Sequence, residues 1–203
     1  MSSETVMKNR IPFPFAVCIT VTLALIPGLF FGKWNFTLWI SFIAWAEYFV
    51  FGAKPDVARF MLPALAFGSA SAAIWMANWV FFENLFNTNY SSTLVSWLIL
   101  GTTDFIWVLG LCYAIEKIKL FNNAGLAMFN GLTLFLAVYF TTLGGAVNAV
   151  PQVGPLDNPY FLVFWCFVWN TLMAWFGWVL GVFNMWVTFP YKVKAKAGVA
   201  VAK

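Results

Sequence analysis

The sequence contains no histidine, and this absence removes several kinds of chemistry at once. Haem, copper and di-iron sites that use imidazole ligands are excluded. Hydrolysis by a serine–histidine pair within the membrane is excluded for the same reason. The chain also lacks a G-x-x-x-x-G-K-[ST] phosphate-binding loop, so it does not hydrolyse nucleotides itself. We therefore expect a protein that is not an enzyme and that holds neither a cofactor nor a metal ion.

Charged residues are scarce, at 9% of 203 residues, against about 25% in soluble domains. Hydrophobic residues make up 63% of the chain, and aromatic residues 21%. A chain of this size has no core large enough to bury so much apolar surface in water. Lipid is therefore the expected solvent.

Cysteine is also rare, with three residues at positions Cys18, Cys112 and Cys166. All three lie inside apolar runs, their number is odd, and their spacing matches no metal or redox motif. We interpret them as small apolar residues that pack between helices.

Six apolar runs are long enough to cross a bilayer, which takes about 20 residues. They cover residues 12–31, 34–51, 58–82, 93–115, 126–149 and 161–189. The polar stretches 83–92 and 150–160 are expected to lie outside. The sequence thus predicts an all-α fold, a polytopic membrane bundle of six transmembrane helices over residues 12–189. A cytoplasmic N-terminal segment (1–11) precedes it and a basic cytoplasmic tail (190–203) follows it.

The basic residues fall on one side of the membrane once these runs are taken as spans. Only Lys33 falls outside the set, which comprises Lys8, Arg10, Lys54, Arg59, Lys117, Lys119, Lys192, Lys194, Lys196 and Lys203. Basic loops are retained on the cytoplasmic side, so both chain ends are predicted to be cytoplasmic. The basic residues do not cluster on one folded face, so we expect no nucleic-acid partner. Contact with the lipid bilayer, through its anionic headgroups, explains them.

Two ionisable residues lie well inside the runs, Asp104 and Glu47. Asp104 is at mid-depth, where an ionised carboxylate costs about 2.5–3.5 kcal/mol, and no Lys or Arg lies at that depth. It is protonated, or held by neighbouring hydroxyls and amides, or in contact with a cation; a neutral inter-helix hydrogen bond is an equally good interpretation. For Glu47, snorkelling to the inner face or pairing with Lys54 or Arg59 is preferred, and a station at the inner end of a path is the alternative.

Further polar side chains lie near mid-depth on other runs, and together with the two acids they define a candidate substrate path: Asp104, Asn170, Glu47, Tyr139, Ser69, Ser71 and Thr103. Single amides and hydroxyls also commonly hold membrane helices together, so the pattern allows a path without requiring one. Small residues at G-x-x-x-G spacing, Gly177 and Gly181, and also Gly68, predict close helix packing.

The segment 34–76 reads WNFTLWISFIAWAEYFVFG, then a short charged turn, then LAFGSASAAIWM. This segment resembles the DUF1097 group of small bacterial inner-membrane proteins. The closing WFGWVLGVFNMW, from Trp175 to Trp186, is similar to the glycine-rich last helix of that group. The resemblance implies a location in the bacterial inner membrane. It supplies no substrate and no catalytic residue.

These features favour a membrane channel or secondary transporter for a small polar or cationic solute, linked to protons through Asp104. An acid without a basic partner in the membrane suits a cation better than an anion. The alternative is a non-catalytic structural or accessory subunit of a larger membrane protein complex. In either case we expect a homo-oligomer or partner membrane subunits.

Overall fold

The computed structural model describes residues 5–31, 38–86, 94–144 and 158–194. The predicted helical fold with six helices is confirmed. They are α1 (Phe13–Phe31), α2 (Leu38–Val50), α3 (Ala58–Leu85), α4 (Leu94–Lys117), α5 (Gly125–Gly144) and α6 (Pro159–Val187). A 3-10 turn, η2 (Pro55–Val57), leads into α3, and the described residues also form two short strands, β1 (Thr5–Asn9) and β2 (Pro190–Lys194), near the chain ends.

Three of the helical segments are long and apolar enough to cross a membrane. They are 55–85, which joins η2 to α3, then α4 and α6, with 31, 24 and 29 residues. The other three helices are shorter in their apolar part. The shortest, α2, has 13 residues, a length of about 20 Å against a hydrocarbon core of about 30 Å. Crossing by α1, α2 and α5 stays a prediction.

The helix α6 shows how the sequence sets the bounds of an element. The Asn158 side chain caps its start by accepting hydrogen bonds from the backbone amides of Tyr160 and Phe161, at 3.0 and 3.3 Å. Pro159 occupies the first turn, where no amide donor is needed. At the other end Phe189 takes the left-handed conformation, with φ 45°, and a proline follows. The chain therefore leaves the helix there and enters β2.

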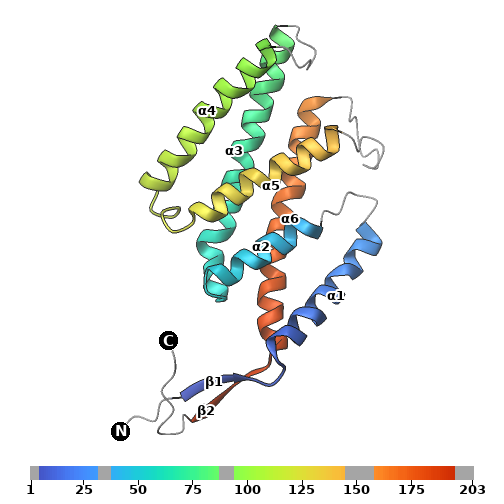
Figure 1. The fold of residues 1–203 in the computed structure, drawn as a ribbon, viewed down its shortest axis with the longest axis vertical. Coiled ribbons are helices and arrows are strands. Elements are labelled where there is room, and N and C mark those ends of the chain that lie inside the picture. The colour runs from blue at the N-terminus through green and yellow to red at the C-terminus, as the bar shows by residue number, and fades with distance from the viewer. Residues whose placement is uncertain (1–4, 32–37, 87–93, 145–157, 195–203) are drawn as a thin grey trace.

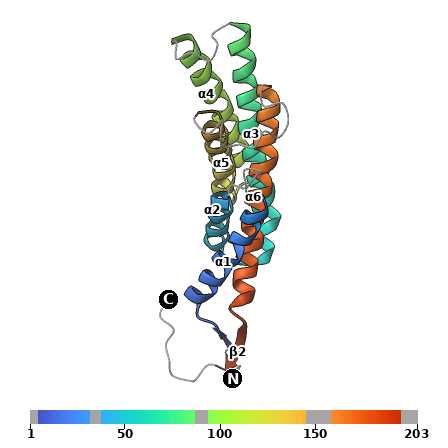
Figure 2. The same ribbon diagram turned by 90° about the vertical axis from the view of Figure 1, so that its right-hand side faces the viewer.

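The helices α3 and α6 form the centre of the bundle. α3 packs against α4, α5 and α6, while α6 also packs against α1, α2 and α5. α4 lies at one end of the long axis and the strand pair lies at the other, in both views (Figure 1 and Figure 2). The central pair is therefore covered by several helices, and α4 packs on one side only.

Glycines lie where two helices approach most closely. A Cβ added at Gly177 would lie 2.7 Å from the Ala44 Cβ, and one added at Gly181 would overlap the ring of Tyr48. These contacts bring α2 and α6 together. On the α3–α5 contact, a Cβ at Gly68 would overlap a backbone carbonyl of α5. The three glycines that the sequence predicts to allow close packing thus all lie at helix–helix contacts.

The two strands were not foreseen by the all-α prediction. They pair antiparallel, from Thr5 opposite Lys194 to Asn9 opposite Pro190. The pairing joins segments from the two ends of the chain, and no local pattern in either segment reveals such a partner. Both described ends of the chain consequently lie together at one end of the bundle (Figure 1).

Candidate functional site: polar groups inside the bundle

The central polar contact is made by Asn170 of α6, which is fully buried. Its side-chain nitrogen donates to the Ser69 hydroxyl at 3.0 Å and to the Gly131 carbonyl oxygen at 3.2 Å. One amide thereby connects α6 to α3 and to α5. Its own carbonyl oxygen has no hydrogen-bond partner among the described residues. The amide can therefore still accept a proton donor from a solute or a water molecule.

A buried acid, Glu83, lies in the last turn of α3, at the end of the bundle away from the strands (Figure 1). Its carboxylate is 1% exposed and accepts hydrogen bonds from Trp79 Nε1, at 2.9 Å, and from the Ser96 hydroxyl of α4. The prediction that Glu83 begins a polar loop is wrong, because α3 continues to Leu85 and Glu83 is buried within it. The i, i+4 spacing of Trp79 and Glu83 was the available signal, since such residues are neighbours on a helix.

A second tie between α3 and α4 is formed by Trp75 and Thr103. Trp75 Nε1 donates to the Thr103 hydroxyl oxygen at 3.0 Å, and this hydroxyl donates in turn to the Ile99 carbonyl at 2.8 Å. The predicted path residue Thr103 is thus engaged in holding α4 against α3.

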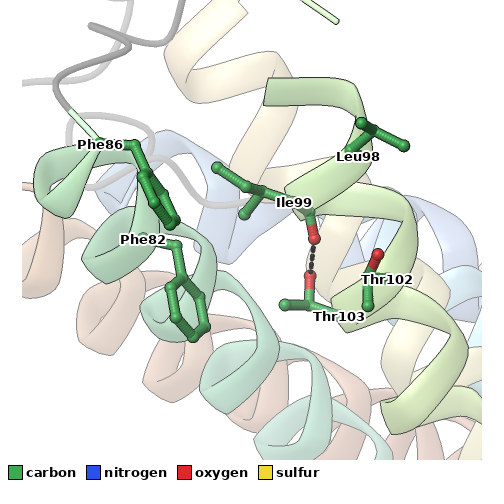
Figure 3. A pocket seen from close by; sticks show the side chains of 6 residues that line it. All are labelled: Phe82, Phe86, Leu98, Ile99, Thr102 and Thr103. Carbon is green, nitrogen blue, oxygen red and sulfur yellow. Dashed lines mark hydrogen bonds between the residues drawn. The ribbon is translucent and has the colours of Figure 1, made fainter. Parts of the chain in front are cut away.

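An open hollow of about 270 Å³ lies beside this tie, between α3 and α4. Figure 3 shows the side chains that line it, which are mainly apolar: Phe82, Phe86, Leu98, Ile99, Thr102 and Thr103. The dashed bond in the figure is the one that occupies the Thr103 hydroxyl. Such a lining suits a hydrocarbon chain and offers little to a charged solute.

The third group lies on α2 and α6 and contains Glu47, Tyr48 and Asn184. They are 3%, 0% and 0% exposed. Within the described part of the chain, neither carboxylate oxygen of Glu47 has a regular hydrogen-bond partner, and the Tyr48 hydroxyl and the Asn184 amide atoms have none either. Asn130 of α5 is the side chain that interacts with the Glu47 carboxylate, without reaching regular hydrogen-bond geometry. Because unpartnered buried polar groups cost about 1–3 kcal/mol each, this group calls for a proton, a water or a ligand.

The preferred interpretation of Glu47, an ion pair with Lys54 or Arg59, does not match the structure. Both basic side chains are exposed, and Glu47 is buried against α5 and α6. Snorkelling does not match this burial either, and the role of Glu47 in a path stays a prediction.

Asp104 lies on α4, half-exposed, and makes no hydrogen bond or ion pair within the described part of the chain. Asn170 takes its partners from α3 and α5. The structure therefore does not bring Asp104 and Asn170 together in one chain.

The remaining path residues, Ser71 and Tyr139, are buried. The Ser71 hydroxyl donates to the Phe67 carbonyl of its own helix at 2.9 Å. The Tyr139 ring stacks on Phe135, with the ring centroids 5.9 Å apart. Among the predicted path residues, Asn170 and Ser69 bond to one another across helices.

No cluster of three or more potential metal ligands occurs among the residues that the structure describes. Comparison with known protein families, with curated proteins and with solved structures finds no match. The resemblance to the DUF1097 group therefore stays a prediction from the quoted residues.

Proposed function

We propose that this chain is a secondary transporter for a small polar or cationic solute, and that Glu47 carries the coupled proton. The observation on which this depends is a carboxyl that is 3% exposed, lies near the Asn130 side chain and has no regular hydrogen bond to either oxygen among the described residues. In a membrane interior such a group holds a proton at rest or exchanges it for a cation. In this proposal all six helices lie in the bacterial inner membrane, with both chain ends cytoplasmic.

The spacing of the polar groups supports a route through the bundle. Asn184 and Asn170 are 14 residues apart on α6, and Ser69 and Glu83 are 14 residues apart on α3. Each interval is about 21 Å of helix, so the inner group, the central contact and the outer acid lie at three successive depths. Because α3 and α6 run antiparallel through the central contact, the two intervals extend in opposite directions from it.

The burial of the central contact favours a transporter over an open channel. The central amide and hydroxyl are both fully buried. A solute can pass only when the helices around them rearrange, and alternating exposure of a central site is how secondary transporters work.

The proposal is tested by proton and cation flux in proteoliposomes, with a pH-sensitive dye inside and methylammonium or K⁺ outside. The wild-type chain should carry a flux above that of protein-free vesicles, and Glu47→Gln should abolish it. Glu116→Gln is the matched control, because Glu116 is exposed at the end of α4. Equal flux in Glu47→Gln and the wild-type chain would exclude Glu47 as the proton carrier.

A second candidate, an accessory subunit of a membrane complex, is favoured by Asp104. This acid is partly exposed on α4, whose main packing partner is α3, and at Gly101, one turn away, an added Cβ would meet nothing within 4 Å. A carboxylate that faces lipid carries a free-energy cost, so this candidate function requires another chain to cover Asp104. Native mass spectrometry should then show an assembly that Asp104→Leu disrupts and Cys112→Leu, an exposed position on the same helix, does not. A wild-type monomer would contradict this second candidate.

A further inference from the structure

The two strands form a ribbon that extends beyond the end of α6 (Figure 1). Its base is fixed by two hydrogen bonds to the Thr188 carbonyl oxygen, from the backbone amides of Arg10 at 3.0 Å and Ile11 at 3.2 Å. β1 and β2 then pair over five residues each. The ribbon is therefore anchored at the point where α6 ends.

The ribbon carries positive charge and no negative charge. Lys8, Arg10 and Lys192 are exposed, and Lys194 belongs to the same strand as Lys192. No Asp or Glu occurs in residues 5–11 or 188–194. Nothing within the ribbon neutralises these cations, so it attracts anions.

Aromatic residues surround the charge at the base of the ribbon. The Arg10 guanidinium lies over the Tyr191 ring, 5.6 Å from its centroid. A hollow of about 370 Å³ opens there, lined by Arg10, Trp186, Phe189, Pro190 and Tyr191. Trp186 is 62% exposed. Trp and Tyr are enriched at the headgroup level of membranes, and guanidinium bonds phosphate oxygens in pairs.

The depth of this hollow follows from the length of α6. The helix has 29 residues and is about 44 Å long, which exceeds the hydrocarbon core of about 30 Å. Its last turn therefore reaches the headgroups. We propose that the hollow and the ribbon bind the phosphate of an anionic phospholipid, with Arg10 on the phosphate and Lys8 and Lys192 around it. This proposal needs α6 in the membrane and is independent of any transport activity.

The test uses the purified full chain in neutral detergent, with tryptophan fluorescence and the unfolding temperature as readouts. Dioctanoyl phosphatidylglycerol should bind and raise the unfolding temperature, whereas dioctanoyl phosphatidylcholine at the same concentration should not. The triple variant Lys8→Gln, Arg10→Gln, Lys192→Gln should lose this difference, at about fivefold in affinity per charge removed. Inorganic phosphate should give no shift, because it lacks the acyl chains that place the headgroup.

The matched control removes three exposed lysines elsewhere on the bundle, Lys54, Lys117 and Lys119, and should bind like the wild-type chain. A milder variant, Arg10→Lys, retains the charge without the paired donors and should weaken binding while the lipid-free unfolding temperature stays unchanged. Three results would overturn the proposal. They are equal shifts of the unfolding temperature with both lipids, a shift with inorganic phosphate alone, and an equal loss of lipid binding in the control variant. If Arg10→Lys binds the lipid with wild-type affinity, Arg10 does not contact the phosphate, and the proposed site is wrong.

Discussion

Asn170 donates a hydrogen bond of 3.0 Å to Ser69, although 101 residues separate the two along the chain. The same nitrogen reaches the Gly131 carbonyl, so three helices meet at one amide. Hydrogen bonds between membrane helices contribute only about 0.6–2 kcal/mol each, because the unfolded chain in the bilayer also finds partners. The contact therefore sets the relative position of α3, α5 and α6 more than it sets total stability.

The coupling between these two residues can be measured with a double-mutant cycle of Asn170→Leu and Ser69→Ala. We expect a coupling free energy of about 0.6–1.7 kcal/mol in SDS-induced unfolding, because each single change removes the shared bond. Ser71→Ala supplies the matched control, since the Ser71 hydroxyl bonds only within its own helix. A cycle of Asn170→Leu with Ser71→Ala should give a coupling near zero, and equal couplings in the two cycles would contradict the contact.

The α2–α6 contact should be sensitive to a single methyl group. Gly177→Ala places a Cβ 2.7 Å from the Ala44 Cβ and against the Ser41 carbonyl oxygen. Overpacking of this kind typically costs about 1–3 kcal/mol in the free energy of unfolding. Gly101→Ala is the control, because nothing lies within 4 Å of its added Cβ, and it should be neutral or stabilising by up to about 1 kcal/mol. Equal effects at the two positions would argue against close packing of α2 on α6.

The six helices could be predicted because apolar runs are bounded by local signals, such as Lys54–Pro55 before α3 and Pro190 after α6. The strand pair could not, since its register joins the two ends of the chain. The lengths of the apolar runs also overstate the number of helices that can span a membrane. Among the described residues, three helices are long and apolar enough to cross, and α2 has only 13 residues.

The candidate site was harder to predict because depth along a run does not tell which way a side chain points. Leu111 and Ser96 mark the buried side of α4, and Thr103 faces the same way through its bond to Trp75. Asp104, one residue on, is turned about 100° from Thr103 and lies within about 20° of Leu111, at the edge of this side, where it is partly exposed. Conversely, Glu47 follows the fully buried Ala44 by three positions and shares its inward face.

The buried acid Glu83 should be more important for holding α4 than its predicted loop position suggested. Glu83→Ala leaves the Trp79 indole nitrogen and the Ser96 hydroxyl without this acceptor, at a cost of about 1–3 kcal/mol in the free energy of unfolding. Glu83→Gln retains an acceptor oxygen and should cost less. Unfolding followed by tryptophan fluorescence measures both, with Glu116→Ala, an exposed acid, as the neutral control. A cost for Glu116→Ala as large as that for Glu83→Ala would contradict the buried contact.

The strand pair predicts a specific cross-link between the two ends of the chain. Met7 and Lys192 are opposite one another, and paired Cα atoms in antiparallel strands lie about 4.5–5.5 Å apart, within the range that disulfides bridge. In a background with Cys18, Cys112 and Cys166 replaced by Ser, Met7→Cys with Lys192→Cys should oxidise to an intramolecular disulfide, seen as faster migration on a non-reducing gel. Met7→Cys with Lys119→Cys should not. Because strands cannot pair through a bilayer, failure of the first pair, or equal yields in both, would contradict the ribbon and with it the placement of both ends on one side.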